Sequence, residues 1–376
     1  MPSILGPQAK TFDPAAKWNL LAPFIRQHGR EALSYATLQQ GMEYFVHDLG
    51  YIAFTTATHP VLARKPRRIV LADPVCDAAD LPLLLAAFLK EFPGAVFPVV
   101  SELCARHLRQ MGFKANCIGY EPELPVQTYN TLGNWKELDM IKRARNESKR
   151  EGITIREVDI ETVPIDQLNA LSAKWIEGKK VNDREIWVYA RRPVYQPEPD
   201  VRKFVAFNRD GAAIGYVFYD PMYRDGKIYG YSANTVRCDE ARYGRLATSI
   251  HMTAIEAFRP EGIEVLNLCL CPFSGIDTGI YADHPVMRWY FQFSERFGGE
   301  IYNFRGISFH KSKYRGMEKP LYFVTNSLMP WNDVYLAFLT SDISKGYFAT
   351  MARLGLGIYK ELTRPKAKVA EKKPAA

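Results

Sequence analysis

A long run of strand-forming residues that leads directly into a helical pattern constrains the fold of this chain most strongly. Residues 204–236 read FVAFNRDGAAIGYVFYDPMYRDGKIYGYSANTV and are rich in aromatic and β-branched side chains. Arg-Asp-Gly turns at 209–211 and 224–226 divide the run, so it predicts an antiparallel meander. A long helix is expected from about residue 244 to 258. The meander therefore delivers a polar strand end, closed by Arg237, beside the start of a helix.

Strand and helix patterns also alternate through the rest of the chain. YFVHDLGYIAFTTAT predicts a hairpin, and SELCARHLRQMGF predicts a helix capped at Ser101. Both halves share the outline strands, helix, strand, helix, strand. We therefore expect an α/β (α+β) fold built from two similar units, each a mixed central sheet flanked by helices. The expected parts are a lead-in (1–30), a first unit (31–132), a second unit with the active site (133–330), a C-terminal helical segment (331–363) and a disordered basic tail (364–376).

Composition restricts the class of protein. The chain has 376 residues, enough for two domains, and 47% of them are hydrophobic, as in folded proteins. Its formal charge of +8 favours anionic partners such as nucleic acid, phospholipid head groups or phosphorylated cofactors, although a basic enzyme without them fits as well. The six cysteines form no CxxC pair, so no metal site is expected, and reduced thiols suit a cytoplasmic protein.

Membrane association is expected to be peripheral. The N-terminus lacks the features of a signal peptide, and no stretch reaches the ~18 apolar residues that span a bilayer. The stretch 344–362 places Tyr347, Met351, Leu354, Ile358 and Leu362 at helical spacing, beside the basic tail. Such a helix suits the inner face of the cell membrane. Core packing or dimerisation explains the same spacing, and the oligomeric state stays open.

Three blocks, in order, carry a resemblance to a known family: GYSANTVR (230–237), LNLCLCPFSGI (266–276) and GGEIYNFRGISFHKSKY (298–314). Their order resembles the cytosolic C-terminal domain of the phosphatidylglycerol lysyl- and alanyltransferases, the multiple peptide resistance factors. LADPV, the basic segment KRARNESKREG and AKWIEGKK match the same domain in order and spacing. The resemblance covers most of residues 35–325.

The resemblance implies a tandem of two GNAT-like acyltransferase folds without the membrane-embedded flippase. It further implies transfer of an aminoacyl group from aminoacyl-tRNA to a lipid hydroxyl, with no cofactor, no DNA, and an anionic phospholipid or membrane surface as partner. Two alternatives stay open. One is an acyl-CoA-dependent N-acyltransferase acting on a small amine or peptide, and the other is a non-catalytic lipid- or protein-binding module.

Acyl transfer needs a group that orients the nucleophile and cations that stabilise the developing oxyanion. Arg237 and Lys313 are the predicted cationic donors, and Glu300 is the predicted proton-transfer group. The family has an Asp three residues before the Arg, where this chain has Asn234, which orients an amine without accepting a proton. The cleft is expected between the strand that ends at Arg237 and the strand that ends at Pro272.

Further residues are predicted to bind substrate, namely Tyr231, Gly244, Ser274, Asn303 and Lys311. If SFHKSKY is a strand, its two lysines project from one face. RYGRLA occupies the place of a pyrophosphate loop, and the basic helix 136–150 is a surface for tRNA or lipid head groups. Each feature also has a plainer interpretation: Arg237 as a partner of Asp239 or Glu240, Ser274 in a tight turn, and the lysines and the basic helix as solvated surfaces.

Overall fold

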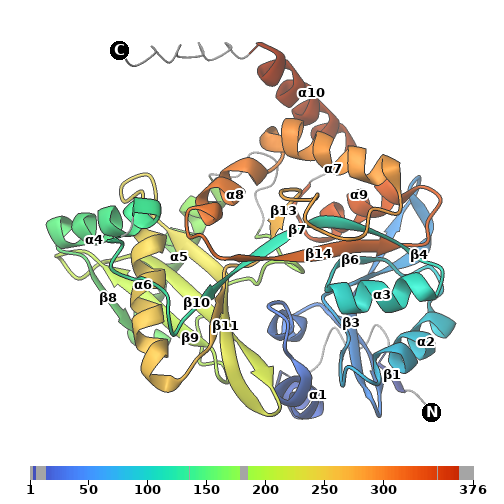
Figure 1. The fold of residues 1–376 in the computed structure, drawn as a ribbon, viewed down its shortest axis with the longest axis horizontal. Helices are drawn as coiled ribbons and strands as arrows, with labels where there is room; N and C mark the ends of the chain where they lie inside the picture. The colour runs from blue at the N-terminus through green and yellow to red at the C-terminus, as the bar shows by residue number, and fades with distance from the viewer. Residues whose placement is uncertain (1–2, 6–13, 135, 178–184, 345, 364–376) are drawn as a thin grey trace, which may run out of the picture.

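Two β-sheets, one of five strands and one of nine, organise the part of the chain that the structure describes (Figure 1). The structure is a computed structural model, and it describes residues 3–5, 14–134, 136–177, 185–344 and 346–363. The expected disordered tail, and the last three residues of AKWIEGKK, lie outside the described residues. Helices flank both sheets, which confirms the predicted mixed α/β class.

The smaller sheet comes from the first part of the chain. Its strands are β1 (Ser3–Leu5), β2 (Glu43–His47), β3 (Gly50–His59), β4 (Ala63–Val70) and β5 (Val75–Cys76). Strands β1 to β4 lie in sequence order and β5 pairs with β3, all antiparallel. The β2–β3 turn lies at Asp48-Leu49, as the sequence predicts.

The larger sheet runs in the order β6-β14-β7-β12-β11-β10-β9-β8, with β13 also paired to β7. Its strands are β6 (Phe97–Val100), β7 (Lys114–Pro125), β8 (Thr154–Glu157), β9 (Arg202–Phe207), β10 (Ala213–Arg224), β11 (Lys227–Cys238), β12 (Val265–Asn267), β13 (Cys271–Pro272) and β14 (Met317–Thr325). Only the pair β11–β12 is parallel among these strands, so the sheet is mixed. Strand β14, which follows residue 316, lies between β6 and β7, which precede residue 126.

Ten α-helices accompany these strands in the described part of the chain. They are α1 (Pro14–His28), α2 (Leu81–Glu91), α3 (Glu102–Gln110), α4 (Asp139–Glu151), α5 (Ile165–Glu177), α6 (Leu246–Phe258), α7 (Pro285–Phe297), α8 (Phe304–Ser312), α9 (Pro330–Thr340) and α10 (Tyr347–Thr363). The Ser101 side chain accepts a hydrogen bond from the backbone of Cys104, so it caps α3 as predicted. Gly152 ends α4 in a left-handed conformation.

The predicted meander and its helix form the framework of the second half. Strands β9, β10 and β11 are antiparallel neighbours, and α6 packs on them before the chain returns as β12. Phe258 at the end of α6 is fully buried and stacks on Tyr231, with ring centroids 4.6 Å apart. This packing holds α6 against the part of β11 that pairs with β12.

Two sequence expectations, for the segments 266–271 and 308–314, are wrong. SFHKSKY is not a strand, since its first five residues end helix α8 and Lys313 is the C-cap. Asn303 caps the start of this helix, and its side chain accepts the backbone N–H of Gly306 at 3.1 Å. LNLCLC is not one strand either, since Cys269 has a positive φ of 62° and separates β12 from β13.

A buried polar cluster lies where β7, β12 and β14 meet. Glu121 on β7 is 2% exposed and accepts a hydrogen bond from Asn267 at 3.0 Å. Lys319 on β14 donates to Glu31 at 2.6 Å. Burial raises the pKa of Glu121 to about 7, and the nearby Lys319 ammonium only partly offsets this.

Glu121 therefore makes stability depend on pH. Its folded pKa lies above the value of an exposed glutamate, so its contribution is intact below pH ~4.5 and is lost as pH rises through about 7. Glu121→Gln keeps an acceptor for Asn267 but cannot ionise. From pH 5 to pH 8 the variant should gain up to about 3 kcal/mol in unfolding free energy relative to the parent, measured with urea.

The exposed carboxylate Glu264 provides the control. Between pH 5 and pH 8, the unfolding free energy of Glu264→Gln relative to the parent should change by less than about 0.5 kcal/mol. Equal pH profiles for Glu121→Gln and the parent protein would contradict the assignment.

Candidate active site

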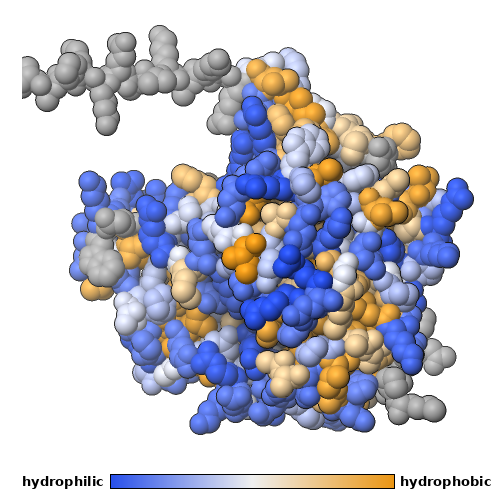
Figure 2. All heavy atoms as spheres, turned by 45° about the vertical axis from the view of Figure 1, so that its right-hand side comes forward, coloured by the Kyte–Doolittle hydropathy of each residue, from blue (hydrophilic) through white to orange (hydrophobic). Residues whose placement is uncertain are grey.

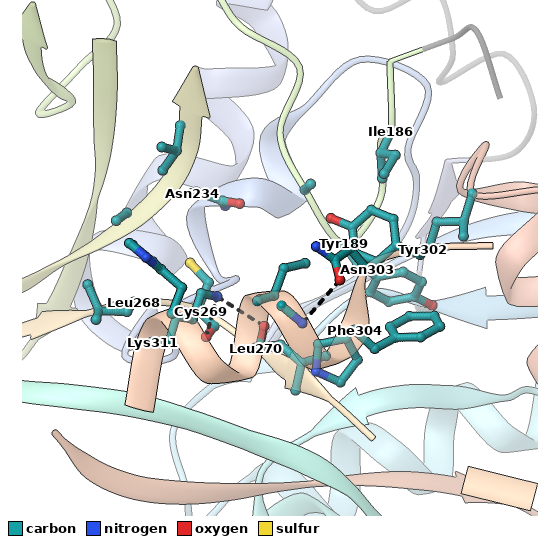
Figure 3. A pocket seen from close by; sticks show the side chains of 18 of the residues that line it. Ile186, Tyr189, Asn234, Leu268, Cys269, Leu270, Tyr302, Asn303, Phe304 and Lys311 are labelled. Carbon is teal, nitrogen blue, oxygen red and sulfur yellow. Dashed lines mark hydrogen bonds between the residues drawn. The ribbon is translucent and has the colours of Figure 1, made fainter. Parts of the chain in front are cut away.

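A cavity of about 440 Å³ lies between the end of β11 and the chain around β13, where the sequence predicts a cleft. Its walls come from β11, residues 186–190, the loop 268–273, residues 302–311 and helix α9. Most of the lining is apolar, with a few polar groups among it, as in binding sites for organic ligands. Figure 3 shows Asn234 and Lys311 approaching this space from different elements.

Asn234 reaches the cavity from β11 and is held by its neighbours. Its amide donates to a carboxylate oxygen of Asp220 on β10 at 2.9 Å. Its carbonyl oxygen accepts the backbone N–H of Arg191 at 3.4 Å. A carboxylate is therefore present one strand away from the position where the family has its aspartate.

Asp220 is 1% exposed and forms a buried ion pair with Arg191. Burial raises the pKa of Asp220 to about 6, although the Arg191 guanidinium lowers it. Sequence reasoning missed Asp220 because its side chain meets Asn234 only through a shift in the β10–β11 register after Phe218.

Arg237 also lines the cavity and is 3% exposed. Its guanidinium lies 3.6 Å from the ring centroid of Trp175 and donates to Glu185 at 2.7 Å. The predicted alternative partners, Asp239 and Glu240, are not the residues with which it pairs. Its Nε–H is buried without a hydrogen-bond acceptor among the described residues.

Lys311 on α8 and Lys313, the C-cap of this helix, have different surroundings. Lys311 lines the cavity, and its ammonium donates to the carbonyls of Cys269 and Leu270 at 3.0 and 3.1 Å. Lys313 is outside the lining, with its ammonium 4.0 Å from the ring centroid of Phe309. They do not share a face because residues two apart on a helix point about 200° apart. The predicted pairing of these lysines is therefore wrong.

Asn303 is the remaining predicted residue in the lining. Four further predicted residues, Tyr231, Gly244, Ser274 and Glu300, lie outside the lining. Tyr231 is in the core against Phe258, and Gly244 is in an exposed turn before α6. Ser274 is buried and donates to Glu295 at 3.0 Å. Glu300 accepts a hydrogen bond from Lys360 of α10 at 3.1 Å.

Two histidines that sequence reasoning missed lie in the lining. His251 on α6 bonds to the Tyr219 hydroxyl at 2.9 Å, and burial lowers its pKa to about 3. His310 on α8 lies 3.3 Å from the Tyr314 hydroxyl. Burial lowers its pKa, and the charges of two nearby lysines lower it further. A neutral His310 can accept a proton, and a helical interpretation of SFHKSKY would have indicated the His310–Tyr314 pair.

One more polar group in the lining has no partner. The hydroxyl of Tyr189 is buried and unpaired among the described residues, like the Nε of Arg237. Buried polar groups rarely remain unpaired without a reason, and a bound ligand is one such reason. No group of three or more His, Cys, Asp or Glu side chains among the described residues is placed to hold a metal ion.

Comparison with known proteins decides the family. The sequence profile described as "Phosphatidylglycerol lysyltransferase, C-terminal" matches residues 22–325. The chain belongs to this family. The family is described as a lysyltransferase domain, so the chain carries a transferase domain of the acyltransferase class. The predicted resemblance is confirmed.

Solved structures agree with the family assignment. L-PGS from Bacillus licheniformis is 17% identical, with a TM-score of 0.67 over 86% of this chain and 95% of that chain. The C-terminal domain of a putative lysylphosphatidylglycerol synthetase from Agrobacterium fabrum is 19% identical, with a TM-score of 0.69 over 89% and 100%. An uncharacterized protein of Corynebacterium glutamicum is 20% identical over 303 residues. That match covers 78% of this chain and 37% of the relative.

The contact between Asn234 and Asp220 generates a test. Asn234→Asp restores the family's carboxylate but replaces the N–H donor with a second carboxylate oxygen beside Asp220. At pH 8 the variant should lose about 1–3 kcal/mol of stability, because a hydrogen bond is replaced by repulsion. At pH 5 the loss should be smaller, because the two carboxylates share a proton.

Thermal or urea unfolding at both pH values measures this effect. Asn303→Asp is the matched control in the same cavity, since aspartate serves equally well at a helix N-cap, and should change stability by less than about 0.5 kcal/mol. An Asn234→Asp protein as stable as the parent at pH 8 would disprove the contact.

Proposed function

We propose that the protein transfers an aminoacyl group from aminoacyl-tRNA to a hydroxyl group of a membrane lipid. The observation that carries this proposal is the cavity, in which the unpaired Arg237 Nε–H and Tyr189 hydroxyl lie with Asn234 and Lys311. Structures with the same fold include L-PGS from Bacillus licheniformis and the C-terminal domain of a putative lysylphosphatidylglycerol synthetase, which supports the same reaction class.

The chemistry follows from the groups in the cavity. The acceptor hydroxyl attacks the ester carbonyl, a new C–O bond forms, and the C–O bond to the tRNA ribose breaks. His310 accepts the hydroxyl proton and returns it to the leaving ribose oxygen. Arg237 Nε–H stabilises the oxyanion. Lys311 contributes its third ammonium proton, since two are bonded to carbonyls.

The donor amine has its own contact in this arrangement. The carbonyl oxygen of Asn234 accepts only a long hydrogen bond of 3.4 Å, from the Arg191 backbone, and can accept a second one from the amine of the aminoacyl group. Because the Asn234 N–H donates to Asp220, the amide orientation is set, and its oxygen keeps a lone pair for a ligand in the cavity.

A surface for the tRNA is available on α4. The helix and the 3₁₀ turn 136–138 before it carry exposed basic side chains, namely Lys136, Lys142, Arg143, Arg145, Lys149 and Arg150. Only some of them are neutralised locally, as in the Arg143–Asp139 pair at 2.6 Å. Such a surface binds a phosphate backbone without reading its sequence.

Transfer of radiolabelled amino acids from tRNA to phosphatidylglycerol vesicles tests the function. Arg237→Ala should lower the rate about 100-fold, because one oxyanion donor is lost. Arg237→Lys keeps the charge and should retain part of the rate. Arg224→Ala is the matched control, since Arg224 also pairs with a carboxylate, Glu264, and lies over a tyrosine ring, but outside the cavity.

No labelled lipid with any amino acid would disprove the proposal. Labelled acetyl-CoA with small amines forms a second arm of the assay, and transfer there alone would establish the acyl-CoA reaction instead. Melting temperatures of the Arg237 variants separate a loss of chemistry from a loss of folding.

A second prediction concerns His310. Because only neutral imidazole accepts a proton, the rate should fall as pH drops through the pKa of His310, which lies below the ordinary histidine value. His310→Asn should lower the rate about 100-fold and remove this acid limb of the pH profile. His107→Asn on α3 serves as the control. An unchanged acid limb in His310→Asn would exclude His310 as the base.

A further inference from the structure

Helix α10 lies on the protein with an unusual orientation. It packs against α7 and the short 3₁₀ turn 298–300. The side toward the protein carries the half-buried Leu354 and Ile358 together with small and polar residues. Thr350 is buried, and Gly357 lies so close to the Phe297 carbonyl that a Cβ would be 2.1 Å from its oxygen. Glu361 pairs with Arg305 at 3.3 Å on the same side.

The opposite side of α10 is apolar. We call it the outer face of α10 and define it as Phe348, Met351, Ala352, Gly355, Leu356, Tyr359 and Leu362, all exposed. Their spacing of 3, 4, 7, 8, 11 and 14 residues from the first places them on one side of the helix. Helices on the surface of a globular protein normally turn that side inward. Here most of the large apolar side chains of the helix face outward instead, so the outer face needs another covering.

Neighbouring elements extend the apolar surface. On α7, which contacts α10, Val286 and Trp289 are 46% and 59% exposed, and Trp289 stacks on Phe293. Figure 2 shows hydrophobic side chains gathered at this end of the molecule. Within the described residues, none of the helices combines the length and apolar character needed to cross a bilayer.

The charge of the sequence that follows α10 indicates what covers its outer face. The sequence that follows α10, RPKAKVAEKKPAA, contains five Lys or Arg residues and a single acidic residue. An apolar helix face followed by a polybasic stretch provides the two components of interfacial attachment, burial of side chains among lipids and attraction to anionic head groups. We propose that the outer face of α10 docks on the surface of an anionic lipid bilayer.

The position of α10 gives the docking a consequence for the cavity. Residues 298–305 form the segment that lies between α10 and the cavity. Glu300 and Arg305 of this segment pair with Lys360 and Glu361 of α10, whereas its residues 302–304 line the cavity. A bilayer docked on the outer face therefore lies about 10 Å, the diameter of α10, plus this one segment away from the cavity. Helix α10 follows residue 325, outside the part matched by the family profile.

Flotation of the purified full chain with vesicles tests the proposal in the absence of tRNA, so its outcome is independent of the proposed transfer reaction. Binding is expected with vesicles of phosphatidylcholine and phosphatidylglycerol, and about tenfold weaker binding with phosphatidylcholine alone. Tyr359→Ser/Leu362→Ser should weaken binding to the anionic vesicles about tenfold. Val61→Ser/Leu83→Ser, two exposed apolar residues of the first unit, is the matched control and should bind like the parent.

A second variant tests the charge component. Replacing Lys366, Lys368, Lys372 and Lys373 by Gln should weaken anionic binding by about tenfold or more and leave binding to neutral vesicles unchanged. Absence of binding, or equal binding by the α10 variant and its control, would overturn the proposal. Light scattering without lipid gives the remaining outcome. If the parent protein is a dimer and the variant Tyr359→Ser/Leu362→Ser is a monomer, a second copy covers the outer face of α10. That result would overturn the proposal.

Discussion

Two buried ion pairs hold one wall of the cavity, and the site depends on them. The segment 185–191 is attached at one end by Glu185 to Arg237, and at the other by Arg191 to Asp220. Between these ends it supplies Ile186 and Tyr189 to the lining. Removing one member of a buried pair leaves an uncompensated charge, at a typical cost of 3–5 kcal/mol. The same strands, β10 and β11, thus fix both the wall and the residues that face it, so the cavity is shaped before any ligand arrives.

Much of the framework was predictable from local patterns. Arg-Asp-Gly turns determine the meander, Ser101 and Gly152 begin and end helices, and a polar strand end beside a helix placed Asn234 and Arg237 at the cavity. These features depend on short-range chemistry. The role of Asp220 was not predictable, because it rests on a register shift between two strands. The His310–Tyr314 pair was missed because two lysines at a spacing of two favoured a strand.

The C-terminal helix shows a different limit of pattern reasoning. The sequence suggests a stripe through Leu354 and Ile358, which are half-buried in the structure. The exposed stripe is instead centred on Phe348 and Tyr359, because the close approach of Gly357 to α7 determines how the helix is rotated. A helical periodicity finds the helix but not its contact face when both sides contain apolar residues.

The strand order of the larger sheet also dictates when the protein can fold. Among the described strands, β6 pairs only with β14, and β7 pairs only with β12, β13 and β14. All three partners follow residue 264. During synthesis on the ribosome, β6 and β7 therefore emerge long before the strands that complete their hydrogen bonds. Unpaired edges of this kind attract other chains, and such long-range pairing slows folding. The nascent chain must keep these edges apart from its neighbours until residues 317–325 have been made.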